Sequence, residues 1–257
     1  MIDLHMHTIL SDGKSEHEDH IKEAFLKGLT TIGFTDHICL KPVNWAIREE
    51  DIPVMVHRMQ ELISQNTVPL DILFGAELDY FPEKETELAK IIASLPLDYV
   101  IGSVHFIDDW NFDTDKSLYG KWSNDELYYR YFELVIQAAK SGLFDIIGHA
   151  DLIKKFRIWP ESDMDSLYEK VVKVLAENHV VVELNTSGYD RPCGEFFPNA
   201  RFLEYCFHYG VNLTMGSDAH QSSQVGRYFD QAKDLLRQIG FRHLVTFKQR
   251  RQSIISL

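Results

Sequence analysis

Six short apolar runs in this chain end in a histidine or a carboxylate. The endings are His5 and His7, His37, Glu77, His105, His149, and Asp218 with His220. Imidazole and carboxylate groups are common ligands of zinc, iron(II) and manganese(II). Residues two apart on an extended strand project to the same side, so each pair can point to one place. The pattern predicts a centre where the ends of several strands hold divalent metal ions.

The other candidate ligands lack this strand-end context or differ in chemistry. Asp12, just after the first pair, can close over the same site as a further ligand. Cys39 follows His37 by two residues, but the surrounding set is of nitrogen and oxygen type, so we interpret it as a small buried residue. We expect His17 and His20 on a solvated helix face. No metal role is predicted for His17, His20, His57, His179, His208 and His243.

Seven β-rich runs alternate with longer amphipathic stretches, which predicts parallel strands joined by helical crossovers. The predicted strands are Ile2–His5, Thr31–Thr35, Asp71–Gly75, Tyr99–Ser103, Phe144–Gly148, Val180–Leu184 and Asn212–Met215. The predicted helices are Ser15–Lys27, Asp51–Ser64, Glu83–Ser94, Asn124–Ser141, Met164–Glu177, Ala200–Tyr209 and Val225–Gln238. Ser15 and Glu18 have capping-box spacing at the start of the first helix. Seven such units favour a closed or nearly closed barrel, whose active site lies at the C-terminal ends of the strands.

Size and charge narrow the class of protein. The chain has 257 residues, 45% of them hydrophobic, which suits a single domain over residues 1–257. Its net charge of −13 disfavours nucleic acid as the main partner. No run reaches the roughly 18–20 apolar residues that cross a membrane, and the first residues do not resemble a signal peptide, so we expect a cytoplasmic protein. Three scattered cysteines predict no disulfide framework.

The motifs around the candidate ligands resemble, in order, those of the polymerase and histidinol phosphatase (PHP) family. They are His5-Met-His7, Asp12-Gly13, Thr35-Asp36-His37, Gly75-Ala-Glu77, Gly102-Ser-Val-His105, Gly148-His149 and Gly216-Ser-Asp218-Ala-His220. The resemblance spans essentially the whole chain and implies an α/β fold, a distorted (β/α)7 barrel. It also implies a centre of three zinc, iron or manganese ions. Their ligand sets would be His5, His7, Glu77 and Asp218; Asp12, His37 and His220; and Glu77, His105 and His149, with Glu77 bridging.

Family resemblance further implies phosphoester hydrolysis. Divalent metal clusters generate hydroxide near neutral pH and bind anionic oxygens. We therefore expect direct in-line attack on phosphorus by a metal-bridging hydroxide, with Glu77, Asp218 and His220 as catalytic residues. No cysteine phosphate loop or aspartyl nucleophile motif is present, which argues against a covalent phosphoenzyme. A non-catalytic metal-binding protein is an alternative of another class, but such a protein would more simply use closed sites.

Two segments, 102–113 and 185–198, resemble the corresponding segments of the histidinol-phosphate phosphatases within this family. We therefore expect a small phosphorylated substrate, L-histidinol phosphate, in histidine biosynthesis. Another PHP phosphoesterase, acting on phosphotyrosine, nucleotides or oligonucleotides, is the alternative. Arg157 and Arg191 are candidate phosphate ligands, and Asp109 and Trp110 are candidates for the cationic end of the substrate. Trp110 packed under its own loop is the competing interpretation. The end of strand Val180–Leu184 carries no metal ligand and is predicted to serve substrate recognition.

Overall fold

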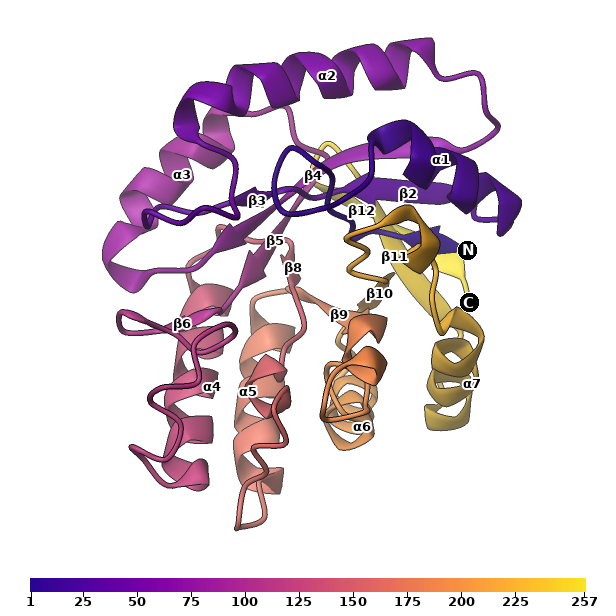
Figure 1. Cartoon of the computed structure of the whole chain (residues 1–257). Helices are drawn as coiled ribbons and strands as arrows, with labels where there is room; N and C mark the ends of the chain where they lie inside the picture. Colours follow the sequence, from indigo (N-terminus) through magenta and orange to yellow (C-terminus); the bar gives the residue numbers. More distant parts are fainter.

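The structure is a computed structural model that describes all 257 residues, and its centre is a nearly closed barrel of seven parallel strands (Figure 1). The strands follow the order β1 (Ile2–Asp3), β2 (Thr31–Phe34), β4 (Asp71–Asp79), β5 (Tyr99–Ser103), β8 (Ile146–Ile147), β9 (Val181–Asn185) and β10 (Leu213–Gly216). The short β3 (His37–Ile38) pairs with β4 beyond the end of β2. The predicted α/β barrel is confirmed.

The first and last strands close the barrel through their backbones. The Leu4 amide donates to the Met215 carbonyl over 2.9 Å, and the His7 amide donates to the Ala219 carbonyl over 2.9 Å. Met6 and Ala219 form an isolated parallel bridge beyond the ends of β1 and β10. Closure therefore brings residues from opposite ends of the sequence to one place.

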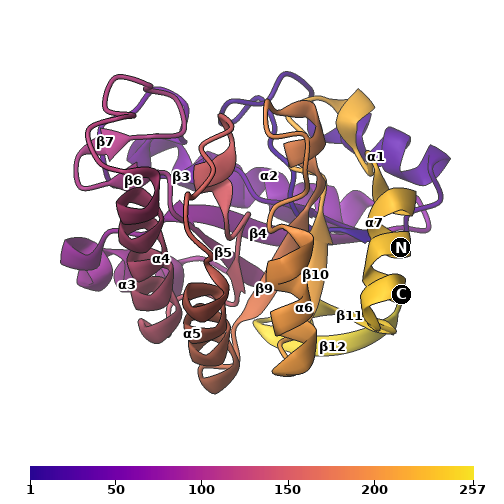
Figure 2. The ribbon, with the colours of Figure 1, turned by 90° about the horizontal axis from the view of Figure 1, so that it is seen from below.

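Seven helices surround the barrel (Figures 1 and 2). They are α1 (His17–Leu26), α2 (Ile52–Gln65), α3 (Glu85–Ser94), α4 (Asn124–Lys140), α5 (Asp165–Glu177), α6 (Ala200–His208) and α7 (Phe229–Ile239). Short 3-10 segments lie at Glu49–Asp51, Pro82–Lys84, Leu152–Lys154, Thr186–Asp190 and Ser222–Gln224. None of the helices is long and apolar enough to cross a lipid bilayer.

Two predicted helix starts were wrong. Helix α1 begins at His17 after Glu16, without a side-chain cap, and the Ser15 hydroxyl instead accepts a hydrogen bond from the Ser222 amide. Helix α7 begins at Phe229 rather than at Val225. The reason is a turn at Gly226 and Tyr228, both of which have positive φ angles.

The prediction that His17 and His20 face solvent was also wrong. Their exposed fractions are 1% and 0%, and both rings pack against Phe34, with centroids 4.6 and 6.0 Å away. The buried face of α1 consists of His17, His20, Ile21 and Ala24. These positions have the i, i+3, i+4, i+7 spacing of a helix stripe that faces the core. The two histidines thus occupy positions that an apolar residue would usually fill.

A C-terminal hairpin, β11 (His243–Lys248) and β12 (Arg251–Ser256), was not predicted. It lies at the end of the barrel opposite the small hairpin β6 (Phe106–Ile107) and β7 (Trp110–Asn111) (Figure 2). The ring of Phe247 packs 5.7 Å from that of Tyr99 at the start of β5. The Gln249 amide donates to the Asp98 carboxylate over 3.1 Å. The hairpin therefore covers the N-terminal ends of the strands.

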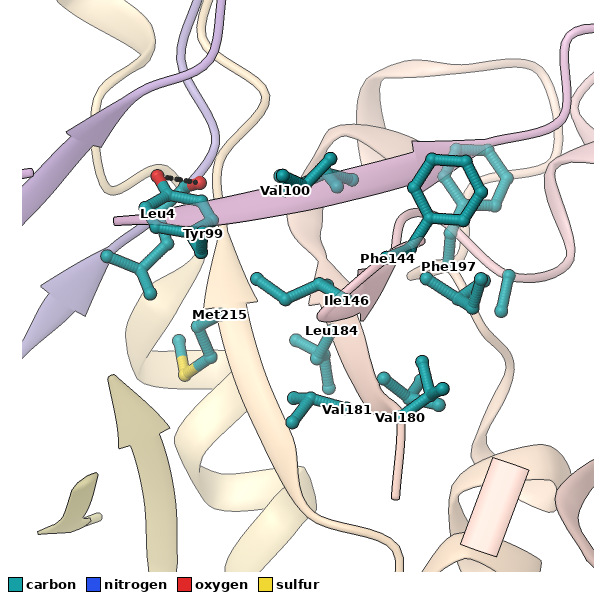
Figure 3. Packing of buried hydrophobic residues seen from close by; sticks show 14 of the residues in the cluster. Leu4, Tyr99, Val100, Phe144, Ile146, Val180, Val181, Leu184, Phe197 and Met215 are labelled. Carbon is teal, nitrogen blue, oxygen red and sulfur yellow. Dashed lines mark hydrogen bonds between the residues drawn. The ribbon is translucent and has the colours of Figure 1, made fainter. Parts of the chain in front are cut away.

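The core beneath the candidate site is tightly packed (Figure 3). Tyr99, Ile146, Leu184 and Met215, from β5, β8, β9 and β10, are fully buried. The Tyr99 hydroxyl donates to the Leu4 carbonyl over 2.8 Å, which joins β5 to the end of β1. This packing fixes the positions of the strand ends from which the ligands project.

Candidate metal centre

The residues predicted to bind metal converge at the C-terminal end of the barrel. They form three groups within which the ligand atoms lie no more than 4.8 Å apart: His7, Asp12, His37 and His220; His5, Glu77 and His149; and His5, His7 and Asp218. His105 lies beside the second group, with Nε2 3.8 Å from Oε1 of Glu77. The groups share His5 and His7, so the ligands form one continuous cluster. This division differs in detail from the three sets that the family resemblance implies.

Glu77, on β4, is at the middle of the cluster. Its Oε2 lies 3.1 Å from Nε2 of His5 and 3.0 Å from Nδ1 of His37. Its Oε1 lies 2.9 Å from Nε2 of His149 and accepts a hydrogen bond from the Ser103 hydroxyl over 2.5 Å. Burial favours the neutral acid, but His37 and His5 outweigh it and hold the pKa of Glu77 well below its usual value. The carboxylate is therefore charged and has histidines on both oxygens.

Carbonyl and carboxylate oxygens orient the histidine rings from behind. Nδ1 of His105 bonds to Asp79 over 2.9 Å, and Nδ1 of His220 bonds to the Asp218 carbonyl over 3.0 Å. Nδ1 of His5 bonds in the same way to Glu183, on β9, over 2.7 Å. Such contacts fix the proton on Nδ1 and turn the Nε2 lone pair toward a metal.

Nearby carboxylates also favour protonation of two histidines in the cluster. Burial disfavours the charged imidazolium, but Asp79 outweighs burial and raises the pKa of His105 to about 10. Burial also opposes the charge on His220, but Asp12 and Asp218 raise its pKa to about 9. A group of buried carboxylates needs positive charge nearby, and protons or metal ions can both supply it.

The surroundings of His7 indicate whether the cluster suits a metal ion. Its ring is fully buried, and neither ring nitrogen makes a hydrogen bond. Nε2 lies 3.3 Å from Oδ1 of Asp218 and 3.4 Å from Oε2 of Glu77. Burying polar nitrogens without partners is costly, and coordination to a cation would satisfy one of them. The ligands are all nitrogen or oxygen donors, so the residues fit divalent transition-metal ions.

Two ligands have strained backbones where their strands end. The φ angle is +25° at His149 and +51° at Asp218, in a region that residues other than glycine rarely adopt. The His149 amide donates to Oε2 of Glu183 over 2.8 Å, and its carbonyl accepts from the Tyr131 hydroxyl over 3.3 Å. Such strain persists where the surroundings impose it, and it is concentrated at functional sites.

A cavity opens above the cluster. Besides the ligands Asp12, His37, Glu77, His105, His149, Asp218 and His220, its lining includes Trp45, Asn111, Asp113, Lys155 and Arg191. Sequence reasoning missed Lys155 and Asp113, whose Nζ and Oδ1 atoms lie 2.5 Å apart. The sequence around Lys155 gives little indication of a function. Only the fold places its side chain in the cavity at the C-terminal end of the barrel. The cavity thus combines the ligand cluster with two cationic side chains.

Of the residues predicted to bind substrate, only Arg191 lines this cavity. Arg157 donates from Nε to the Pro192 carbonyl over 2.6 Å and does not line the cavity. Asp109 is fully exposed and pairs with Lys41. Trp110 is buried, and its Nε1 donates to the Asp115 carbonyl over 2.8 Å, so it packs within its own loop.

Comparison with known proteins agrees with this geometry. The family model of the PHP domain matches residues 3–187. The chain belongs to the PHP family. The Deinococcus radiodurans protein named "Probable histidinol-phosphatase" is 33% identical over 258 residues, covering 98% of each chain. "Histidinol-phosphatase" of Bacillus subtilis is 26% identical and covers 89% of this chain and 96% of that protein.

A solved structure is similar to this PHP chain over nearly its whole length. Histidinol phosphate phosphatase from Lactococcus lactis, complexed with zinc, L-histidinol and phosphate, superposes with a TM-score of 0.83 at 23% identity, and the match covers 98% of each chain. The PHP match to the sequence ends at residue 187, before Asp218 and His220. The structural match includes this last part, so the PHP barrel is complete through β10.

Proposed function

We propose that this chain is a metal-dependent histidinol-phosphate phosphatase, which hydrolyses L-histidinol phosphate to L-histidinol and phosphate in histidine biosynthesis. One observation carries the proposal: buried His, Glu and Asp groups of a PHP barrel open into a cavity that also contains Arg191 and Lys155. Full-length similarity to proteins named as histidinol-phosphatases supports this choice among the activities that the fold hosts.

We propose that the centre holds three divalent ions, which are zinc, iron or manganese. The zinc in the Lactococcus lactis relative supports this type of ion. Asp12, His37 and His220 would hold one ion, with His7 alongside. His5, His7 and Asp218 would hold another, and Glu77, His105 and His149 the third, with Glu77 shared. Ions bound there supply Lewis acidity and a hydroxide nucleophile near neutral pH.

The chain's own residues complete the site. Arg191 and Lys155 are the cationic side chains in the cavity, and we assign them to the phosphate group, whose oxygens pair well with such donors. Asp113 provides a carboxylate for the ammonium of the substrate. Glu77, Asp218 and His220 line the cavity and are the proposed catalytic residues. Arg157, Asp109 and Trp110 lie outside the cavity lining and have no role in this proposal.

A phosphate-release panel tests the substrate. Metal-loaded protein is assayed with histidinol phosphate, phosphotyrosine, nucleotides and short single-stranded DNA. We expect kcat/KM for histidinol phosphate to exceed the others by at least about tenfold, equal to ~1.4 kcal/mol of transition-state stabilisation. A smaller preference would refute the substrate assignment and leave a PHP phosphoesterase of other specificity. Release of phosphate from none of the monoesters would favour a non-catalytic metal-binding protein.

A further inference from the structure

Glu183 is buried in β9, the strand whose end carries no predicted metal ligand, and its exposed fraction is 1%. Its Oε1 accepts a hydrogen bond from Nδ1 of His5 over 2.7 Å. Its Oε2 accepts from the backbone amide of His149 over 2.8 Å and from Nδ2 of Asn185 over 3.2 Å. One carboxylate therefore contacts two of the candidate ligands, which come from β1 and β8.

The neighbouring strand leaves room for this carboxylate. A Cβ atom added at Gly216, on β10, would lie 2.0 Å from Oε1 of Glu183 and 2.5 Å from the Cβ of His5. A side chain at that position would therefore displace Glu183 or His5. Glu183 is absent from the lining of the cavity, so it does not reach a molecule bound there. Its contacts point to a role exerted through the ligands.

Each contact determines how one ligand is presented. A carboxylate only accepts hydrogen bonds, so Nδ1 of His5 carries a proton toward Glu183, and Nε2 is directed to Glu77, 3.1 Å away. The second contact anchors the amide of His149, whose backbone φ angle is +25°. His149 then directs Nε2 to the other oxygen of Glu77, at 2.9 Å.

His5, Glu77 and His149 form one of the three ligand groups, and Glu183 holds both of its histidines. We propose that Glu183 is a positioning residue for the two metal positions to which His5 and His149 are assigned, and that it acts from a strand that supplies no ligand. The proposal rests on the proposed metal-dependent function. None of the hydrogen bonds of Glu183 reaches the group of His7, Asp12, His37 and His220, so its effect should be selective.

The test measures metal retention in the full-length Glu183→Gln variant. Glutamine offers one accepting oxygen, and its amide NH2 must face either the Nδ1 proton of His5 or the amide of His149. Zinc-loaded parent and variant are dialysed against increasing chelator, and bound zinc is counted by mass spectrometry. We expect the variant to lose two zinc equivalents at a chelator concentration about 10–100-fold lower than the parent. The remaining zinc should be lost at the same chelator concentration as in the parent. The visible spectrum of the cobalt-substituted variant should differ from that of the cobalt-substituted parent.

Asp98→Asn is the matched control. Asp98 is a buried carboxylate that accepts hydrogen bonds from the amides of Phe74 and Gln249 at the opposite end of the barrel. This variant should lower the melting temperature and keep the zinc count and cobalt spectrum of the parent. Glu183→Asp is the second variant, for use if the glutamine variant does not fold. The shorter side chain cannot span both contacts, so this variant should also bind zinc more weakly than the parent at the positions of His5 and His149.

Two results would overturn the role of Glu183 and leave the proposed function standing. One is parental zinc affinity and an unchanged cobalt spectrum in both Glu183 variants. The other is loss of all zinc in a single step together with unfolding, which would assign Glu183 a purely structural role. A parent protein that binds no divalent metal would instead overturn the proposed function, so the two failures are distinguishable.

Discussion

Metal binding at this centre should release protons, because several ligands are protonated in the metal-free protein at pH 7. The pKa of His105 is raised to about 10 and that of His220 to about 9. Burial opposes the charge on His5, but Glu183, Glu77 and Asp218 outweigh it and raise its pKa well above its usual value. Burial lowers the pKa of His37 to about 3, so this ring is already neutral. Only neutral imidazole binds a metal.

These shifts set the size of the effect. The pKa of His105 lies about three units above pH 7, so removing its proton at pH 7 costs ~4 kcal/mol. The pKa of His220 lies about two units above pH 7, and removing its proton costs ~3 kcal/mol. Metals must displace both of these protons and that of His5, which gives release of about three protons at pH 7. The overall metal-binding constant should then rise by up to about 10³-fold per pH unit between pH 7 and 8.

Calorimetric titration of zinc into the chelator-treated protein measures this release. Titrations at one pH in buffers with different ionisation enthalpies give the number of protons from the slope of enthalpy against ionisation enthalpy. His57→Asn is the control, because this histidine is exposed on α2 and should leave the slope unchanged. A slope near zero would refute the charge assignment of the cluster.

The same shifts predict how the metal-free fold responds to pH. The folded-state pKa values of His105 and His220 are raised above the unfolded value near 6.5. Their contribution to stability is therefore fully present below about pH 6.5 and is lost as the pH rises through about 9 and 10. Bound metal removes these protons, so this loss should disappear in the metal-loaded protein.

The remaining predictions separate substrate binding from folding. Arg191→Gln and Lys155→Met should each lower kcat/KM for histidinol phosphate about 100-fold, or ~2.7 kcal/mol, in steady-state kinetics. Asp109→Asn is the control and should change kcat/KM less than about twofold. Equal effects of the three variants would contradict the assignment. Phe247→Ala should lower the free energy of unfolding by ~3–5 kcal/mol, because its buried ring packs under Tyr99, and leave kcat of the metal-loaded enzyme unchanged. Urea unfolding measures the first effect, and a matching loss of kcat would show that the hairpin also shapes the site.

The convergence of most candidate ligands was predictable because the fold brings strand ends together by one rule. Parallel strands end at one face of a barrel, so a histidine or carboxylate after each strand reaches the same site. His5 and Asp218 lie just beyond β1 and β10, and Glu77 lies two residues before the end of β4. Glu183 was missed because it lies inside the predicted strand Val180–Leu184, whereas Glu77 follows the predicted strand Asp71–Gly75. A lone carboxylate in the apolar run Val180-Val-Val-Glu183-Leu was the available signal, since a buried charge requires a partner.

The C-terminal hairpin was missed for a different reason. Its turn residues are Gln249 and Arg250, with φ angles of +49° and +64°. Two-residue turns with both φ angles positive usually contain asparagine, aspartate or glycine, and none is present here. Instead Asp98 accepts a hydrogen bond from both turn amides, through its carboxylate from Gln249 and through its carbonyl from Arg250. A tertiary contact therefore imposes a turn that the local sequence does not favour.

Closure of the barrel and assembly of the metal centre depend on the same backbone contacts. The His7 amide donates to the Ala219 carbonyl, and the Ala219 amide donates to the His5 carbonyl. Ala219 lies between Asp218 and His220, so pairing of the first and last strands also brings their four ligand side chains together. Joining residues so distant in sequence costs chain entropy, and a shared cation offsets part of that cost. Because metal binds the closed barrel and not the open chain, saturation at about 1,000 times Kd adds ~4 kcal/mol to stability. The cluster is therefore both the proposed reaction centre and a link between the two ends of the chain.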